Sequence, residues 1–178
     1  MIETERLILR NWRAEDRGPF AAMSADAEVM QHIGGPLDRA DSDAAADRLA
    51  TSADSDGYCF WAAERKGDGA FLGFCGLRRG GHQGTAVTDE LEIGWRLRRD
   101  AWGMGYAREA ALASLAWGWA NCAAARIAAW TVLANQPSWR LMERIGMVHR
   151  PELDFDHPRF PIGHPLSRHL VYTIERPQ

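Results

Sequence analysis

The sequence of 178 residues has no long apolar run and few cysteines. No stretch approaches the about 20 apolar residues that a membrane-spanning helix needs. The first five residues, MIETE, lack the basic and apolar segments of a secretory leader, so we expect a cytoplasmic protein without membrane association. Cys59, Cys75 and Cys122 are scattered, which favours reduced thiols over disulfides. Cys75 is the least implausible nucleophile among them, against the interpretation of a small buried hydrophobe.

Basic residues are not in excess, and lysine is nearly absent. The 21 basic and 24 acidic residues give a net charge of −3, whereas nucleic-acid-binding domains are usually basic, so we expect no nucleic-acid partner. Residues 1–89 carry ten basic and fifteen acidic side chains, a net charge of −5. Residues 90–178 carry eleven and nine, a net charge of +2. An anionic ligand therefore fits the second half of the chain better than the first.

The overall composition is that of an ordinary folded domain. Apolar residues make up 46% and charged residues 25%, which excludes a disordered chain, a collagen and a disulfide scaffold. A chain of this length buries about 70% of its unfolded surface without help from disulfides or metals. No repeat, linker or low-complexity tract divides it. We therefore expect a single α/β domain over residues 1–178.

The spacing of apolar residues predicts six strands and five helices. Alternation is clearest at residues 91–97, where every second residue is apolar and the others are polar or glycine. The expected strands are residues 4–13, 58–64, 70–77, 91–97, 127–133 and 169–175. The expected helices are residues 14–23, 26–33, 38–51, 106–122 and 136–145, and residues 66–69 form a hairpin turn.

The stretch WGMGYA at residues 102–107 stands between the alternating strand and a long apolar helix. Gly103 and Gly105 permit conformations that point successive backbone N–H groups in one direction. The helix adds its unsatisfied first-turn N–H groups and the positive end of its dipole. Together these features predict an anion cradle suited to a pyrophosphate. No Walker A pattern is present, and Arg108 stands where a Rossmann fingerprint needs a small residue.

This stretch resembles the acetyl-CoA loop of the GNAT superfamily of N-acetyltransferases, [Gln/Arg]-x-x-Gly-x-[Gly/Ala], with Trp102 at its first position. A W-G-x-G-Y-A loop followed by Glu-Ala, here residues 109–110, is typical of the RimJ/RimL-like branch of ribosomal-protein acetyltransferases. Four other stretches are similar to the family in the same order: TERL at 4–7, GFCGL at 73–77, EIGW at 92–95, and NQPS at 135–138 with GM at 146–147.

The resemblance implies an α/β (α+β) GNAT fold, a mixed central sheet of about six to seven strands flanked by helices. Two adjacent parallel strands would splay apart, and the backbone of Trp95 and Leu97 would bond the pantetheine arm of the coenzyme. Arg98 and Arg99 would meet the ribose phosphate, unless they are solvated turn residues. The N–H groups from Gly103 to Ala107 would hold the pyrophosphate. The loop residues implied to bind the cofactor are Trp102, Gly103, Met104, Gly105, Tyr106 and Ala107.

The resemblance also implies contacts after the second parallel strand. The amide of Asn135 would bond the coenzyme arm or cap the following helix, and the two roles are compatible. Many GNAT enzymes carry a tyrosine as general acid four residues after the position of Ser138. Met142 stands there and cannot donate a proton. In the RimJ/RimL-like branch a serine at the position of Ser138 takes that role, so the resemblance implies that Ser138 is the acid. A thiolate leaving group, with a pKa near ~8.5 by analogy with cysteine, needs only a weak acid.

The attacking amine needs a base, because primary amines are largely protonated at pH 7. Glu92, on the polar face of the strand that leads to the loop, is the expected base. A solvated or ion-paired carboxylate is the competing interpretation, and Glu90 and Asp100 are alternatives. A backbone N–H near Trp95 would stabilise the developing oxyanion.

Several other residues leave two interpretations open. The four histidines between residues 149 and 169 match no ligand spacing, so we expect no metal, and they either form loop structure or shape the acceptor pocket. Trp12 and Trp61 are candidates for lining that pocket. The acidic helix from residue 38 falls in the region that covers the acceptor site in this fold. It would favour a cationic amine, or it is a solvated face.

The sequence thus predicts an acetyl-CoA-dependent N-acetyltransferase that moves the acetyl group directly from thioester to amine. The acceptor is a protein N-terminal α-amine or a small-molecule amine, and the family resemblance suggests a homodimer. The alternative is a non-catalytic acyl-CoA-binding or sensing module on the same fold. A nucleotide-dependent oxidoreductase is a third possibility, which Arg108 speaks against.

Overall fold

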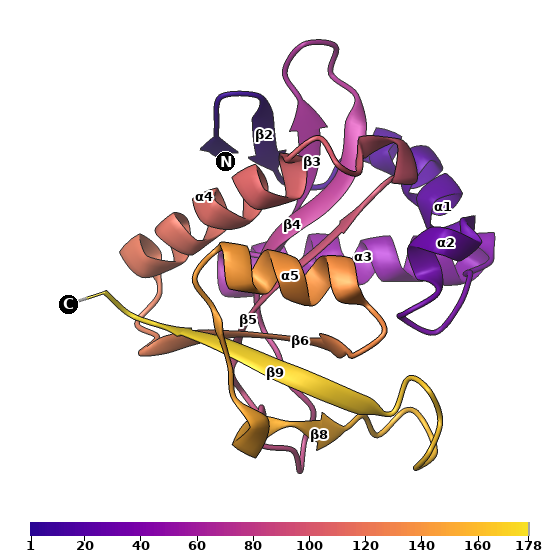
Figure 1. Cartoon of the computed structure of the whole chain (residues 1–178). Helices are drawn as coiled ribbons and strands as arrows, with labels where there is room; N and C mark the ends of the chain where they lie inside the picture. The colour runs from indigo at the N-terminus through magenta and orange to yellow at the C-terminus, as the bar shows by residue number, and fades with distance from the viewer. Residues whose placement is uncertain (178) are drawn as a thin grey trace.

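One mixed sheet runs through the computed structural model, which describes residues 1–177 (Figure 1). Within these residues the sheet order is β1-β2-β3-β4-β5-β6-β9-β7, with β8 paired to β9. The strands are β1 (Ile2–Glu3), β2 (Leu7–Arg10), β3 (Phe60–Arg65), β4 (Phe71–Arg79), β5 (Leu91–Leu97), β6 (Arg126–Val132), β7 (Val148–His149), β8 (Phe155–Asp156) and β9 (Arg168–Glu175).

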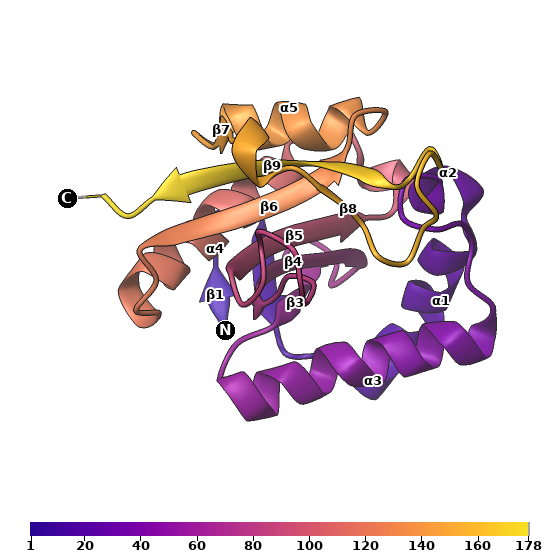
Figure 2. The same ribbon diagram turned by 90° about the horizontal axis from the view of Figure 1, so that it is seen from below.

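Helices cover both faces of the sheet, as the view from below shows (Figure 2). They are α1 (Arg17–Ala25), α2 (Ala27–Met30), α3 (Arg39–Asp56), α4 (Tyr106–Asn121) and α5 (Gln136–Arg144). The larger apolar core lies between the sheet and the helices α4 and α5. A smaller, aromatic core lies on the opposite face, under α1 and α3. The predicted α/β architecture with a mixed sheet is confirmed.

Strand β5 shows how the sequence pattern fixes the two faces. Ile93 and Leu97 are buried in the larger core, as their alternation predicts. Gly94 and Arg96 point to the opposite face, where the aromatic ring of Phe60 leaves no room for a side chain at position 94. A Cβ built on Gly94 would lie 2.6 Å from that ring. The strand is therefore half polar in sequence and yet covered on both sides.

The sheet opens between β5 and β6. Strands β4 and β5 pair over seven residues, from Gly73 opposite Leu97 to Arg79 opposite Leu91. The parallel strands β5 and β6 pair at a single position, Glu92 opposite Ala128. Beyond that point the two strands diverge, so the last part of β5 keeps an open edge toward β6. The predicted splayed pair is confirmed.

The boundaries differ from the sequence prediction mainly at short elements. Nine strands are found within residues 1–177, instead of six to seven, because β1, β7 and β8 have two residues each. Such short pairings carry no periodicity that a sequence could reveal. Helix α3 continues past the predicted end at residue 51 to Asp56, and Gly57 ends it with a φ of +77°. None of the described helices is long and apolar enough to cross a membrane.

Candidate active site

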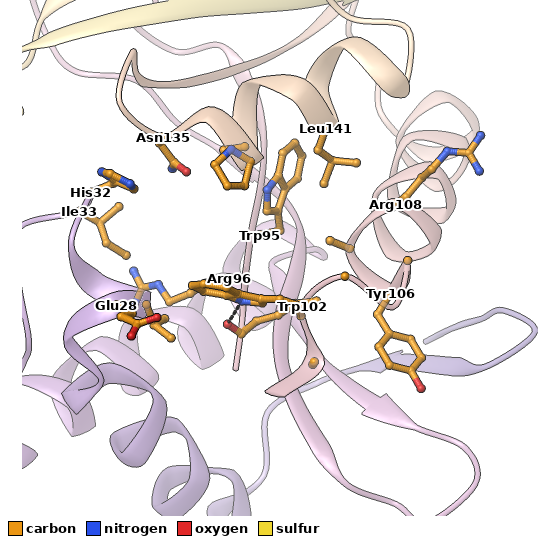
Figure 3. Close-up of a pocket in the computed structure, with 18 of the residues that line it drawn as sticks. Glu28, His32, Ile33, Trp95, Arg96, Trp102, Tyr106, Arg108, Asn135 and Leu141 are labelled. Carbon is orange, nitrogen blue, oxygen red and sulfur yellow. Dashed lines mark hydrogen bonds between the residues drawn. The ribbon is translucent and has the colours of Figure 1, made fainter. Parts of the chain in front are cut away.

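A cavity of about 370 Å³ lies where β5 and β6 diverge. Its walls come from the end of β5, the loop before α4, the start of α5 and the short helix α2. Figure 3 shows two ends: Tyr106 and Arg108 lie on one side, and Glu28, His32 and Arg96 on the other. Trp95 and Trp102 lie between them. After the expectations from the sequence, the first is called the coenzyme end below, and the second the acceptor end.

The loop at the coenzyme end has the backbone conformation of an anion cradle. Gly103 and Gly105 have φ angles of +74° and +81°, in the left-handed region that favours glycine. Gly105 is the N-cap of α4, so no side chain caps the first turn of the helix. The N–H groups of Tyr106 and Ala107 precede the first helical bond, which runs from the N–H of Glu109 to Gly105. These N–H groups and the helix dipole favour an anion there.

The N-terminal segment braces this loop. The guanidinium of Arg6 donates to the Met104 carbonyl at 2.9 Å and pairs with Glu109 at 2.7 Å. The hydroxyl of Thr4 also donates to Glu109, and the Arg6 guanidinium lies over the ring of Tyr106, 4.6 Å from its centre. Burial opposes ionisation of Glu109, but the hydrogen bonds from Thr4 and Arg6 outweigh it and lower its pKa. The TERL and Glu-Ala motifs, about a hundred residues apart, thus form one support.

The basic side chains at the coenzyme end differ from those predicted. Arg108 and Arg144 line the cavity. Arg98 does not; its guanidinium pairs with the neighbouring carboxylate of Asp100 at 2.6 Å. Arg99 is likewise outside the lining and pairs with a carboxylate of α2 at 2.9 Å. The expectation that Arg98 and Arg99 meet a phosphate is therefore not supported, because nearby carboxylates hold both side chains.

The open edge of β5 presents backbone groups to the gap. The N–H of Arg98 donates to Leu72 of β4 at 2.8 Å, so it points away from β6. Because these groups alternate in direction along a strand, those of Trp95 and Leu97 point toward β6. The indole N–H of Trp102 donates to the Leu97 carbonyl at 2.9 Å and holds its ring against the cavity. The remaining groups of this edge can pair with an extended amide chain.

Asn135 and Ser138 both line the cavity at the start of α5. The side-chain amide of Asn135 donates to the hydroxyl of Thr131 at 2.9 Å and makes no capping bond to the helix. The N-cap alternative is therefore wrong for its side chain, although its backbone carbonyl accepts from the N–H of Ser138 at 3.1 Å. Met142 is 2% exposed and belongs to the core, so it takes no part in proton transfer.

Glu92 does not reach the cavity lining. Its carboxylate is buried and accepts from Arg78 of β4 at 2.7 Å. Burial raises the pKa of Glu92, against the opposing effect of Arg78. The sequence placed Glu92 on a polar strand face, but the adjacent strand covers that face with an arginine. Glu92 is therefore better explained as an ion-paired strand residue than as the base. Its alternative Glu90 pairs with Arg126 in the same manner.

The acceptor end carries three charged or titratable residues that the sequence analysis missed. Glu28 and His32 come from α2 and the turn after it, and Arg96 comes from β5. Burial lowers the pKa of His32, which is therefore a neutral imidazole at pH 7. Burial lowers the pKa of Arg96 to about 10, so it stays a cation. No motif marks these residues; the only signal was the short helix predicted at residues 26–33.

Two predicted lining residues of the acceptor pocket lie in the cores. Trp61 is 3% exposed and packs edge-on against Trp117 of α4. Trp12 packs against Phe20 and donates its indole N–H to the Phe60 carbonyl at 2.8 Å. The cavity lining contains neither tryptophan. The sequence pattern around Trp12 and Trp61 could not show whether these side chains line a cleft or lie in a core, because a cleft and a core are both apolar environments.

The remaining candidates lie away from the cavity. Helix α3 is largely exposed and does not line it. Cys75 is fully buried, and burial raises its pKa to about 12, so it is not a nucleophile at neutral pH. The ring of His157 lies tilted against those of His82 and His169, away from the pocket, and His149 contacts Asp154. Within residues 1–177 no group of three metal-ligating side chains is arranged to hold a metal ion.

Comparison with known proteins identifies the family. Residues 6–148 match the model of the GNAT acetyltransferase domain. The chain belongs to the GNAT acetyltransferases. It is 32% identical over 147 residues to the uncharacterized protein YkkB of Bacillus subtilis, covering 82% of this chain and 84% of YkkB. An acetyltransferase of the GNAT family from Bacillus anthracis has the same fold, with a TM-score of 0.79, 25% identity and 98% of both chains covered.

A further solved structure agrees with the predicted RimJ/RimL-like branch at the level of the fold. RimL, a ribosomal L7/L12 α-N-protein acetyltransferase solved in complex with coenzyme A, has a TM-score of 0.75 and 13% identity, with 97% of this chain and 95% of RimL covered. The predicted family is confirmed. The protein is a GNAT N-acetyltransferase, and its acceptor has to be argued from the site.

Proposed function

We propose that this GNAT enzyme transfers an acetyl group from acetyl-CoA to a primary amine bound at the acceptor end of the cavity. One observation supports this proposal above all. A single cavity joins an anion cradle at a helix N-terminus to an open strand edge and ends at a neutral imidazole. Each part answers one need of the reaction: phosphate binding, alignment of the thioester arm, and removal of a proton.

The donor is held along the coenzyme end and the open edge. The backbone N–H groups from Gly103 to Ala107 bind the pyrophosphate, and Arg108 and Arg144 add positive charge. The backbone of Trp95 and Leu97 pairs with the amides of the pantetheine arm, assisted by the side-chain carbonyl of Asn135. Acetyl-CoA supplies the acetyl group as a thioester. The residues of this end position that thioester and take no covalent part.

Ser138 is the residue we assign to the leaving sulfur. It lies in the first turn of α5 and lines the cavity. As the amine nitrogen bonds to the acetyl carbon, the carbon–sulfur bond breaks. The sulfur leaves as a thiolate and takes the proton of the Ser138 hydroxyl, which water then restores. A backbone N–H of β5 near Trp95 donates to the carbonyl oxygen as negative charge develops on it.

His32 is the residue we assign to the amine proton, in place of Glu92. A base must be uncharged or anionic before the reaction, and the lowered pKa of His32 leaves its imidazole neutral at pH 7. Glu28 also lines the acceptor end, but its carboxylate is engaged by Arg99 at 2.9 Å. His32 therefore accepts the proton and releases it to solvent at the cavity mouth.

The test is a coenzyme A release assay with acetyl-CoA and a pooled amine panel. The pool holds peptides with free N-termini, polyamines and free amino acids, and mass spectrometry identifies any acetylated product. We expect an acetylated amine, and a fall in kcat of about 10²–10³-fold for Ser138→Ala with little change in the dissociation constant for coenzyme A. Gln136→Ala, at a neighbouring exposed position outside the lining, is the matched control.

Two results would contradict the proposal. Coenzyme A binding without turnover on any amine, and unchanged by Ser138→Ala, would favour the acyl-CoA-binding or sensing module. An active Ser138→Ala enzyme would retain the transferase and remove Ser138 from the mechanism.

The homodimer stays a prediction from the family resemblance, and light scattering of the purified protein tests it.

A further inference from the structure

Arg96 is a partly buried cation that lines the cavity and has no counter-charge among the described residues. Its Nε is buried and has no hydrogen-bond partner within residues 1–177. No described carboxylate forms an ion pair with its guanidinium, which lies over the ring of Phe74, 5.2 Å from its centre. Burial lowers the pKa of Arg96 to about 10, with no partner to offset the effect. Charges removed from water are normally paired, so an unpaired, partly buried arginine that lines a cavity indicates a site suited to an anionic ligand.

The nearest acidic residue of the lining does not supply that anion. Glu28 borders the same end of the cavity, but its carboxylate pairs with the Nε of Arg99 at 2.9 Å. Both side chains of that pair are more than half exposed, so they neutralise one another at the surface. The acceptor end therefore keeps one net positive charge, on Arg96.

The position of Arg96 excludes the coenzyme phosphates as its partner. Arg96 lies with Glu28 and His32 at the acceptor end, whereas Tyr106 and Arg108 of the phosphate cradle lie on the far side of the two tryptophans (Figure 3). The register confirms this direction. Arg96 shares the sheet face of Gly94, opposite Phe74, and that face is turned away from α4. Its guanidinium thus meets whatever enters beside His32.

We propose that the acceptor is a small amine that carries a carboxylate, an amino acid whose α-carboxylate pairs with Arg96 while its amine meets His32. This inference rests on the proposed transfer reaction and names its substrate class. The amine nitrogen forms the new bond to the acetyl carbon as the carbon–sulfur bond breaks, and its proton goes to His32. The carboxylate is not altered and serves only as an anchor.

Geometry and size favour a free amino acid. The planar guanidinium fork matches a carboxylate in a two-point hydrogen bond. A cavity of about 370 Å³ also has to admit the end of the pantetheine arm, which leaves room for a compact acceptor. Val29 and Ile33 line the same end, so an apolar side chain fits beside the carboxylate. A polyamine would place a second positive charge against Arg96, which is unfavourable.

The experiment compares each acid with its uncharged counterpart. Leucine, methionine and phenylalanine are assayed against their α-amides and against the corresponding amines without the carboxylate. We expect kcat/KM to be about 10- to 100-fold higher for the acids, as a charge-assisted hydrogen bond implies. In Arg96→Met, which keeps the packing on Phe74, the ratio of kcat/KM for the acid to that for its counterpart should fall toward one. Arg96→Lys should retain part of it, and Arg140→Met removes an exposed charge of α5 as the matched control.

A second readout separates this inference from the proposed function. N-acetyl leucine and its amide are titrated by calorimetry into the protein with coenzyme A bound. Tighter binding of the acid, lost in Arg96→Met and kept in Arg140→Met, would support the anion site even if no amine were acetylated. Equal binding and equal acetylation of acid and amide would overturn the inference and leave the transferase intact. A preference for peptides with aspartate after a free N-terminus would overturn the assignment of a small acceptor.

Discussion

At the scale of single residues, burial sets the charge that each side chain of the cavity carries. His32 is neutral because its half-buried ring is poorly solvated when protonated. Arg96 stays charged because even a pKa of about 10 lies well above neutrality. Glu28 pairs with Arg99 at the surface. One end of the cavity therefore offers a proton acceptor beside a cation, which is the pattern that an amine with an attached acid requires.

The proton-accepting role of His32 is testable through the pH profile. In the wild-type enzyme kcat/KM should rise along a limb whose pKa lies below the ordinary imidazole value of about 6.5. The reason is that the enzyme is active only with His32 neutral. We expect His32→Gln to remove this limb and to lower kcat by about 10²–10⁴-fold. The limb set by the amine itself should remain in both enzymes.

The control is His164→Gln, since His164 is exposed and lies outside the cavity lining. It should keep both the acidic limb and the wild-type kcat. If the pH profile of kcat/KM were unchanged in His32→Gln, His32 would not be the base. Glu92, acting through a water molecule, would then be the next candidate.

At the scale of elements, the junction between β5 and α4 carries the coenzyme end. Its strand supplies an open edge, its loop supplies two left-handed glycines, and its helix supplies a first turn without a side-chain cap. The N-terminal segment holds the carbonyl of Met104 and the carboxylate of Glu109 through Arg6. The loop is therefore pre-organised by a distant part of the chain before any ligand arrives.

Gly105→Ala should weaken this junction in two ways. A residue with a Cβ at a φ of +81° costs about 1–2 kcal/mol. The added Cβ would also lie 3.3 Å from the Arg6 guanidinium and press on the group that holds the loop. We expect the dissociation constant for coenzyme A to rise by about tenfold or more, measured by calorimetry.

Gly163→Ala provides a matched comparison. Gly163 has a similar φ of +85°, and no atom would contact its Cβ within 4 Å. The Gly163→Ala variant should lose a comparable amount of stability but bind coenzyme A as tightly as the wild type does. Equal effects of the two substitutions on binding would show that general destabilisation, and not the loop, explains the loss.

At the scale of the whole molecule, three histidines from distant segments meet on the sheet face opposite α4 and α5. The ring of His157 lies 4.1 Å from that of His82 and 5.0 Å from that of His169. Burial first, and then repulsion from His82, His169 and Arg159, lowers the pKa of His157 to about 4. Burial also lowers the pKa values of His82 and His169, and Arg78 lowers that of His82 further. The folded protein thus keeps this cluster uncharged.

This cluster should make the folded state less stable in mild acid. The unfolded chain binds a proton at each histidine near pH 6.5, whereas folded His157 resists it until about pH 4. The stabilising contribution is therefore complete above pH 6.5 and declines as the pH falls toward 4. We expect the melting temperature of the wild type to drop between pH 7 and pH 5. The melting temperature of His157→Asn should drop less over the same range. Exposed His164→Asn should follow the wild type, and parallel curves for all three proteins would contradict the assignment.

Part of this protein follows from its sequence alone, because the physical cause is local. The alternation at residues 91–97 predicts a strand with two different faces, and the order of strand, WGMGYA and helix predicts an anion cradle. A hydrophobic period and a helix terminus each depend on residues within one or two turns. The bounds of β5 and the start of α4 accordingly agree with the prediction to the residue.

The tertiary structure decided which side chains face the acceptor, because their environments depend on residues far away in the chain. Glu92 became an ion-paired strand residue through Arg78 on the neighbouring strand. His32 and Arg96 came together through the packing of α2 beside the end of β5, and neither belongs to a recognisable motif. Burial determines charge, and burial depends on neighbours that no local pattern specifies. The sequence alone predicted the fold and the anion cradle, whereas only the packing determined which charged and titratable side chains line the other end of the cavity.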